Sequence, residues 1–178
     1  MPKARLWSDE ECDWLKENIS YDPETGTLTW IKGFSNFVSK GEEVGSLLNS
    51  GYRHFSRRVD GKRLSYSSHR VGWFISYGVF PKTLDHINNI PSDNRLENLR
   101  EATLSQNGGN SSIRKDNTSG AKGVFLRGGR YLAHIYFKGS DKHLGTFETL
   151  EEAAIAYDEA AIEQWGEYAY TNKDHGVY

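Results

Sequence analysis

Apolar residues recur at helical spacing in three parts of the chain. The first helix is predicted over residues 6–19, where Ser8 and Glu11 form a capping box ahead of the apolar positions. The second lies in "SSHRVGWFISYGVFP" and is expected to end at Pro81. The third, "TLEEAAIAYDEAAIEQWGE" over residues 149–167, also opens with a capping box and carries alanines along one side. Those alanines favour close packing of this helix on a sheet.

Between the helices the hydrophobic pattern changes to that of short strands. The run "GYRHFSRRVDGKRLSY", residues 51–66, predicts a hairpin that turns at Asp60 and Gly61. Three further strands are predicted in "KGVFLRGG", "RYLAHIYFKGS" and "DKHLGTFET", which are joined by glycine turns. These elements together indicate the α+β fold class.

A change of composition divides the chain. Residues 107–120, "NGGNSSIRKDNTSG", are rich in Gly, Ser and Asn, which favours a connection between domains. We therefore predict one domain over residues 1–110, a linker over 111–117 and a second domain over 118–178.

The overall charge hides strong segregation along the chain. The formal net charge is −2 and the isoelectric point is near 6.3, which alone suggests no polyanionic partner. Residues 51–70, however, carry six Arg or Lys against one Asp, and residues 114–143 carry seven against two acids. Residues 148–167 carry seven acids and no base. Two basic blocks are thus available for a polyanion although the whole chain is slightly acidic.

Cysteine content and hydropathy indicate the cellular compartment. Cys12 is the single cysteine, which excludes an intramolecular disulfide and a cysteine-rich zinc cluster and suits a reducing cytosol. No apolar run approaches the ~20 residues that a membrane span needs, and the N-terminus lacks the apolar core of a signal peptide. We expect a soluble, cytoplasmic protein with no membrane partner.

Candidate chemistry lies in "TLDHINNIPSDNRLENLR", where Asp85 directly precedes His86. Asn107 follows at a distance that suits a strand, a long loop, a second strand and the first turn of a helix. Aspartate and asparagine supply oxygen ligands, which favour hard divalent ions such as Mg²⁺. His86, with an unperturbed imidazole pKa of ~6.5, suits a general base that activates water for attack on a phosphate. The alternative is a solvated polar loop that happens to contain a histidine.

The longer segment "LDHINNIPSDNRLENLREATLSQN" closely resembles the signature of the HNH endonucleases, the ββα-metal (His-Me finger) nucleases of phage and intron-borne enzymes. The resemblance implies that His86 is the general base. It also implies that Asp85 and Asn107 hold one divalent ion per active site, Mg²⁺ or Mn²⁺. Asn98 is expected to hold the loop by bonding backbone groups.

The same resemblance places the finger at about residues 82–110. Asparagine at the third motif position is also seen in homing-type members of the family. The upstream helix is similar to one that precedes the finger in phage members, which makes His69 and Arg70 candidates for phosphate contact. If the protein is phage-encoded, its compartment is the cytoplasm of the bacterial host.

Residues 119–172 look like an APETALA/ethylene-response-factor DNA-binding domain. The similarity covers the Gly-Val start, the Leu-Gly-Thr-Phe strand and the Ala-Ala-x-Ala-Tyr-Asp helix. It implies a three-stranded antiparallel sheet that enters the major groove and is backed by one helix. The positions expected to face outward and contact DNA are Arg127, Arg130, Tyr131, His134, Tyr136 and Lys142.

The basic hairpin offers a second candidate surface for DNA. Its cations lie among aromatic residues, a combination that suits phosphate binding, although a merely solvated strand pair is the alternative. The cations concerned are Arg57, Arg58, Lys62 and Arg63.

The sequence therefore predicts a metal-dependent endonuclease of double-stranded DNA, of homing type. One finger holds one active site, so a monomer, the slightly favoured state, should nick one strand. The alternative is a DNA-binding regulator whose nuclease finger is vestigial. Filled chemical positions at Asp85, His86 and Asn107 argue against that alternative.

Overall fold

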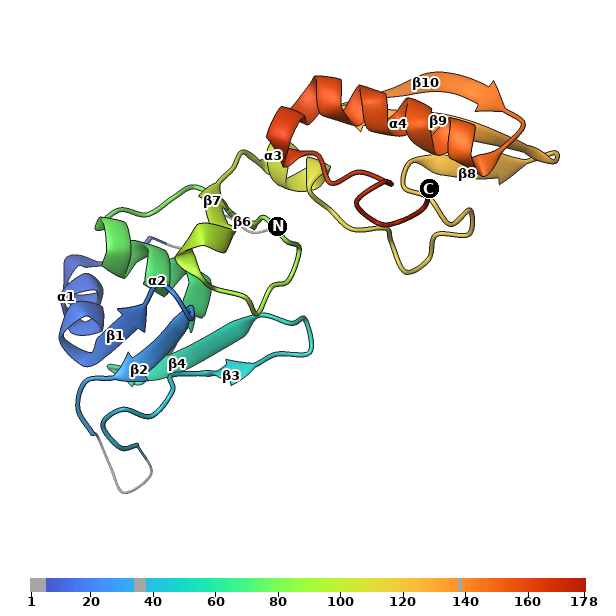
Figure 1. The fold of residues 1–178 in the computed structure, drawn as a ribbon. Helices are drawn as coiled ribbons and strands as arrows, with labels where there is room; N and C mark the ends of the chain where they lie inside the picture. Colours follow the sequence, from blue (N-terminus) through green and yellow to red (C-terminus); the bar gives the residue numbers. More distant parts are fainter. Residues whose placement is uncertain (1–5, 34–37, 138) are drawn as a thin grey trace. The chain divides into compact units, whose positions relative to one another are not determined.

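The computed structural model describes residues 6–33, 38–137 and 139–178 (Figure 1). The chain forms two compact units, Met1–Glu101 and Ala102–Tyr178. The domain boundary predicted after residue 110 lies inside the second unit, so the helix that contains Asn107 belongs to that unit.

Two helices form one side of the first unit. Helix α1, Asp9–Asn18, begins after Ser8, and the predicted capping box is present, with Glu11 N donating to Ser8 Oγ at 3.3 Å and Ser8 N to Glu11 Oε2 at 2.9 Å. Helix α2, Ser68–Tyr77, ends before Pro81, which corrects the predicted end. Gly78 stops it by adopting a left-handed conformation with φ 71°, which glycine accepts without steric cost.

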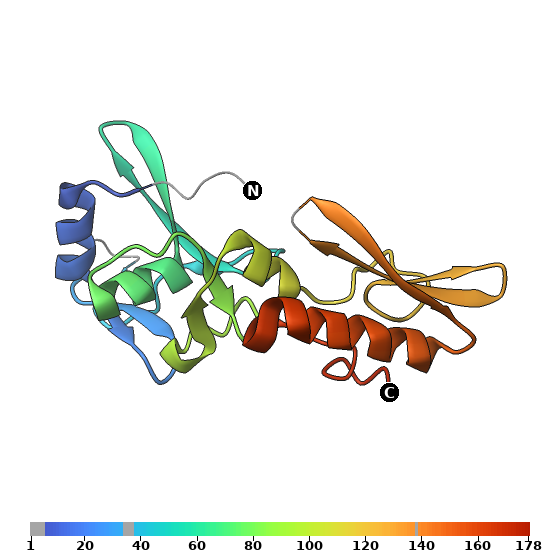
Figure 2. The ribbon, with the colours of Figure 1, turned by 90° about the horizontal axis from the view of Figure 1, so that it is seen from above.

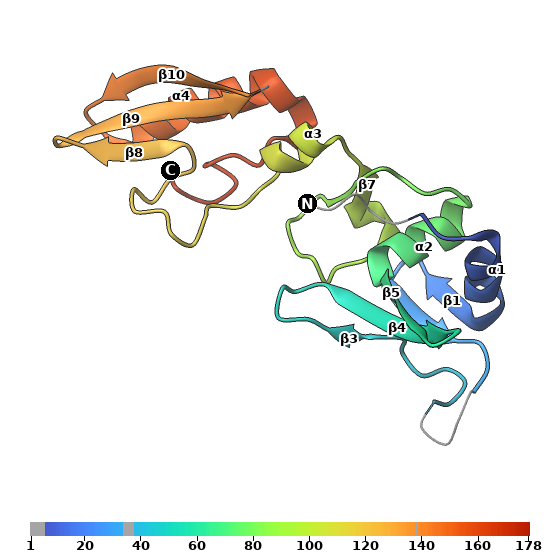
Figure 3. The same cartoon turned by 180° about the vertical axis from the view of Figure 1, so that it is seen from behind.

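The strands of the first unit form three small antiparallel sheets (Figure 3). The first is the hairpin β1 (Ile19–Asp22) with β2 (Thr27–Trp30), and the second has the order β3 (Ser46–Leu47), β4 (Arg53–Val59), β5 (Lys62–Ser67). The third is the short pair β6 (Leu84–His86) and β7 (Leu99–Glu101). A 3-10 turn at Leu96–Asn98 lies between these two strands, directly before β7.

The hairpin predicted over residues 51–66 is present as β4 and β5. Asp60 and Gly61 both have positive φ, 50° and 76°, the signature of the tight turn whose twist matches the strands. Tyr66 from this hairpin is fully buried against Leu15 of α1 and Val71 of α2 in one core cluster. The hairpin is therefore anchored at its base and extends from the core.

The second unit contains a three-stranded antiparallel sheet and the longest helix. The sheet has the order β10 (Ser140–Phe147), β9 (Arg130–Phe137), β8 (Val124–Arg127), and α4 (Leu150–Trp165) lies along one of its faces (Figure 2). Ala153 and Ala154 are fully buried against Ala133 and Val124 of the sheet, so the small side chains allow the close packing that the sequence predicted. The unit also contains α3 (Leu104–Gly109) and a 3-10 turn, Gly166–Tyr168.

Both units mix helices with antiparallel strands, so the predicted α+β class is confirmed. Within the three described ranges, no helix has the length and the apolar character that crossing a bilayer requires.

Candidate active site

Strands β6 and β7 place the Asp-His pair in the interior of the first unit. All three residues of β6 are buried, and the register pairs Asp85 with Arg100 and His86 with Leu99. The apolar side chains of Leu84 and Leu99 are buried as well. The two chemical groups are thus held on a short, packed strand pair, which excludes the alternative of a solvated polar loop.

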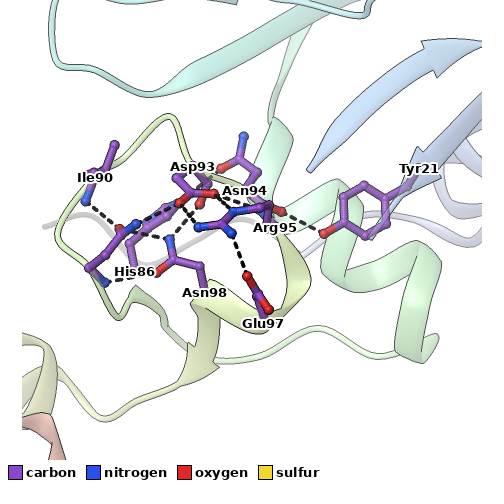
Figure 4. Close-up of polar contacts among 9 residues, drawn as sticks. Tyr21, His86, Ile90, Asp93, Asn94, Arg95, Glu97 and Asn98 are labelled. Atoms are coloured by element: carbon purple, nitrogen blue, oxygen red, sulfur yellow. Dashed lines mark hydrogen bonds and ion pairs between the residues drawn. The ribbon is translucent and has the colours of Figure 1, made fainter. Parts of the chain in front are cut away.

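His86 is 6% exposed and its ring is held by an amide. Its Nε2 lies 3.1 Å from Oδ1 of Asn94, a contact that is a hydrogen bond in the tautomer with the ring proton on Nε2 (Figure 4). The rings of Tyr52 and His69 pack around it, with centroids 5.7 and 5.2 Å away. Burial lowers the pKa of His86, which favours the neutral, proton-accepting form.

Asn94 owes its place to the β1–β2 hairpin. The residue is 2% exposed, and its backbone carbonyl oxygen accepts a hydrogen bond from the hydroxyl of Tyr21 at 2.7 Å. Gly26 in the hairpin turn has φ 73°, and a Cβ there would lie 2.4 Å from backbone atoms of Asn94 and Arg95. The turn therefore fits closely against the segment that orients His86, and only glycine permits this approach.

Asn98 closes the loop between β6 and β7. Its Oδ1 accepts from the backbone N of Asn88 at 3.0 Å, and its Nδ2 donates to the backbone O of Asp93 at 2.8 Å (Figure 4). Arg95 forms a two-point ion pair with Asp93 at 2.9 and 2.8 Å and also contacts Glu97. The hydrogen bonds from Arg95 lower the pKa of Asp93 to about 2, so this ion pair persists into acid. These contacts give the polar run a defined shape.

Asp85 is 3% exposed, and its Oδ2 accepts from Nε of Arg100 at 2.9 Å. The partner explains how a carboxylate is tolerated in this interior, because a buried charge is costly unless it is paired. Arg100 comes from the adjacent strand and occupies the position directly opposite Asp85.

The donor chemistry around Asp85 fits a weakly held hard cation. Among residues 6–33, 38–137 and 139–178, no group of three or more His, Cys, Asp or Glu side chains could hold a metal. Mg²⁺ does not need such a group, because it keeps several waters and is commonly bound by one or two carboxylates together with substrate phosphates. A carboxylate has about four lone-pair sites, so the bond from Arg100 and a metal bond are compatible. One carboxylate and one amide oxygen are therefore a suitable donor set.

Asn107, the other predicted ligand, is half-buried in α3 of the second unit. The structure does not place the two units relative to one another, so the pairing of Asn107 with Asp85 stays a prediction.

His69 and Arg70 lie at the start of α2. The Nδ1 atom of His69 is buried and has no hydrogen-bond partner among the described residues, and burial lowers the pKa of the ring to about 3. A ring that stays neutral is suited to packing beside His86 and offers no charge to a phosphate. Arg70 is half-buried and donates from Nη1 to the carbonyl of Pro81 at 3.2 Å. Their phosphate contacts remain predictions.

The four cations of the basic hairpin separate onto its two faces. Arg57 and Lys62 lie on the face of the buried Phe55 and Tyr66, since positions two residues apart share a face. The Arg57 guanidinium lies 4.1 Å from the ring centre of Trp14 and donates to Tyr66, so it has a packing role. Arg58 and Arg63 are exposed cross-strand partners on the opposite face.

In the second unit, alternate residues of β9 face opposite sides of the sheet. Ala133 and Ile135 are buried on the side of α4, so His134 and Tyr136 point away from the helix. By the same alternation Arg130 points away from the helix. Its cross-strand partner Arg127 lies on the same face. These four residues share the face that was predicted to contact DNA.

Tyr131 and Lys142 depart from that prediction. Tyr131 packs against the alanine core under α4, and Lys142 is the cross-strand partner of buried Ile135. Both therefore lie on the helix side of the sheet. Strand alternation already excludes the predicted set for β9, because the consecutive residues Arg130 and Tyr131 must face opposite sides.

Three residues of the site were missed from the sequence: Asn94, Arg100 and Tyr52. Arg100 could have been found by pairing the two predicted strands so that a basic side chain lies opposite the Asp85 carboxylate. Asn94 gave no such signal, because it lies in a run of turn-forming residues.

Comparisons with known proteins agree with the motif. Residues 66–108 match the family model of the HNH endonucleases, a segment that contains Asp85, His86, Asn98 and Asn107. Over 91 residues the chain is 35% identical to an uncharacterized HNH endonuclease of Acanthamoeba polyphaga mimivirus, which covers 51% of this chain and 46% of the relative. Residues 66–108 are thus similar in sequence to the HNH endonucleases.

Other similarities concern DNA-binding proteins. Over 105 residues the chain is 39% identical to an AP2-like ethylene-responsive transcription factor of Arabidopsis thaliana, covering 53% of this chain and 30% of that factor. It is 36% identical over 105 residues to the ethylene-responsive transcription factor WRI1 of the same plant, covering 53% and 24%. The chain spans less than half the length of each of these three relatives. A solved structure of DNA binding and cleavage by the HNH homing endonuclease I-HmuI aligns with a TM-score of 0.40 and 21% identity, covering 52% of this chain and 51% of that chain.

Proposed function

We propose that this protein is a metal-dependent endonuclease that hydrolyses one phosphodiester bond of double-stranded DNA at a time. The observation that carries the proposal is the state of His86 within the HNH segment. A buried, neutral imidazole is fixed through Nε2 beside a carboxylate on the same short strand.

The chemical role of His86 follows from its tautomer. Because Nε2–H donates to Asn94, Nδ1 is the atom that accepts a proton from the attacking water. As the water oxygen bonds to phosphorus, the bond from phosphorus to the 3′ oxygen breaks and the proton passes to His86. Asn94 then stabilises the resulting imidazolium through the same hydrogen bond.

Asp85 and Asn107 would hold the divalent cation, Mg²⁺ or Mn²⁺. When bound, such an ion stabilises negative charge on the phosphate and on the leaving oxygen. Arg100 orients the Asp85 carboxylate through the bond from its Nε atom. Asn98 maintains the loop that separates the two strands.

DNA affinity is assigned to two surfaces. Arg58 and Arg63 on the hairpin suit phosphate contact, and the face of the second sheet that carries Arg127, Arg130 and His134 suits the major groove. The identity to AP2-like transcription factors over 53% of the chain, together with the resemblance of residues 119–172 to their DNA-binding domain, supports the second assignment. On this basis the second unit supplies affinity and register, as in an enzyme of homing type.

The experiment that tests the proposal is incubation with supercoiled plasmid, with Mg²⁺ or with EDTA. Nicked circles that form with Mg²⁺ and not with EDTA support the endonuclease. Binding without nicking in any divalent metal supports the alternative, a DNA-binding regulator with an inactive finger.

A further inference from the structure

Helix α3 depends on its surroundings for its structure. It spans only Leu104–Gly109, and isolated helices this short do not persist in water. Its first turn is capped reciprocally, since Gln106 N donates to Thr103 Oγ1 at 3.2 Å and Thr103 N to Gln106 Oε1 at 2.8 Å. The remaining support must come from contacts with the rest of the second unit.

A buried lysine holds the C-terminal end of α3. Nζ of Lys122 donates to the carbonyl of Gly109 at 2.7 Å and to the carbonyl of Tyr170 at 3.1 Å. The backbone N of Tyr170 donates to the same Gly109 carbonyl at 3.2 Å. The last carbonyl of the helix thus has two donors from distant parts of the second unit.

Lys122 is itself fixed. Its backbone N donates to Oδ1 of Asn172 at 2.6 Å, and Nδ2 of Asn172 donates back to the Lys122 carbonyl at 3.1 Å. Asn172 also donates from Nδ2 to Asp158 of α4 at 2.9 Å. All three of these residues are buried, so the position of the Lys122 ammonium is set by a closed polar network.

Trp165, the last residue of α4, contacts α3 at two points. Its Nε1 donates to Oγ of Ser105 at 3.1 Å. Its ring lies against the backbone of Gly109 so closely that a Cβ on that glycine would be 2.7 Å from ring atoms. Asn107 lies between these two contacted residues along the helix.

We propose that Lys122 and Trp165 are positioning residues for Asn107. This inference rests on the proposed function, in which Asn107 is a metal ligand. The second unit then has two roles, because the framework that carries the DNA-binding sheet also fixes the helix that carries a ligand. Loosening that framework weakens metal binding without removing any residue that contacts metal or DNA.

Adjacent glycines provide a matched pair of variants for the test. Gly109→Ala forces a Cβ against the Trp165 ring, whereas a Cβ at Gly108 meets no atom within 4 Å. Both changes add the same methyl group to the same helix. Lys122→Met, which keeps the apolar stem and removes the donor, is the second test variant, and circular dichroism checks that each variant is folded.

The readouts are Mn²⁺ affinity, measured by electron paramagnetic resonance on the protein–DNA complex in a His86→Ala background, and the Mg²⁺ concentration for half-maximal nicking. For Gly109→Ala and Lys122→Met we expect the Mn²⁺ affinity to fall and the Mg²⁺ concentration for half-maximal nicking to rise, each by about 10-fold or more. DNA affinity in EDTA should stay unchanged, and Gly108→Ala should match the parent. Wild-type metal affinity in folded Gly109→Ala and Lys122→Met would overturn the inference while leaving the nuclease intact. A parent protein that binds no Mn²⁺ and nicks no DNA would overturn the proposed function and this inference with it.

Discussion

His86 is oriented by one amide side chain, and this contact is where a single substitution has the clearest chemical effect. Asn94→Ala removes the acceptor of Nε2–H but leaves Asp85 and the loop-closing Asn98 in place. We expect nicking at saturating DNA to slow by about 10- to 100-fold, in the range for partners that orient a reacting group. Single-turnover rates measure the effect.

The control for that variant is Asn49→Ala, at an exposed asparagine of the same unit. It should nick at the wild-type rate. If Asn94→Ala keeps the wild-type rate while remaining folded, the assigned role of Asn94 is wrong.

Lys122 provides a prediction on pH at the residue scale. Burial lowers its pKa from 10.5 to about 8 in the folded chain. Between pH 8 and 10.5 the unfolded chain therefore binds more protons at this residue than the folded chain does. As a result, the contribution of Lys122 to the free energy of unfolding rises with pH across that window. The rise is about 3 kcal/mol at most.

Urea unfolding of the wild type and of Lys122→Met at several pH values isolates this contribution. The difference in unfolding free energy between them should increase from pH 8 upward in favour of the wild type. A difference that is independent of pH would show that Lys122 keeps its ordinary pKa.

The sequence was enough to select Asp85, His86 and Asn98 as candidates, because their residue types and spacing indicate their chemistry. The structure adds their burial and their partners, and the catalytic and metal-binding roles stay predictions. Asn94 could not be predicted, because its role depends on the β1–β2 turn, which lies far away in the chain and approaches it closely only through Gly26. Contacts of this kind arise from tertiary packing and leave no local pattern.

At the scale of elements, the hairpin β4–β5 places two like charges directly opposite one another. Such a pair is destabilising by roughly 0.2–1 kcal/mol, and a bound anion would relieve the repulsion. Arg58→Glu replaces the repulsion with an attraction to Arg63. We therefore expect the variant to be as stable as the wild type or more so, but to bind DNA more weakly.

Two measurements check this prediction. The midpoint of thermal unfolding should not fall, and the slope of log affinity against log salt should become shallower by about 1. Lys40→Glu, also exposed in the same unit, controls for the general change of charge. A salt slope equal to that of the wild type would remove the hairpin from the DNA interface.

Helices and turns were predictable at this scale where capping chemistry marks them. Ser8 with Glu11 and Thr149 with Glu152 locate the starts of α1 and α4. The end of α2 was misplaced at Pro81, because glycine in a left-handed conformation stops a helix earlier than a following proline does. The facing of Tyr131 and Lys142 was also wrong, since it depends on the register of β9 with its neighbours.

At the scale of the whole molecule, charge segregation reconciles an acidic chain with the polyanionic partner that we propose. The acidic residues concentrate in α4, on the side of the second sheet away from Arg127 and His134. The net charge of −2 therefore does not describe the electrostatic field at the basic faces that we propose as DNA contacts.

The proposed function also predicts the order of products. A chain with one active site would cut one strand at a time, so nicked circles should accumulate from supercoiled plasmid before any linear form. A gel time course at limiting enzyme measures this order. Linear product that appears without a nicked precursor would instead indicate an assembly with two active sites.

The most direct test of the central claim is a comparison of the wild type with His86→Ala at saturating protein, with Mg²⁺ present. DNA affinity is measured on the same preparations. We predict that the variant binds DNA nearly as well as the wild type and that its nicking rate falls by about 100-fold or more, because it has lost its general base. Nicking by folded His86→Ala at the wild-type rate would contradict the account.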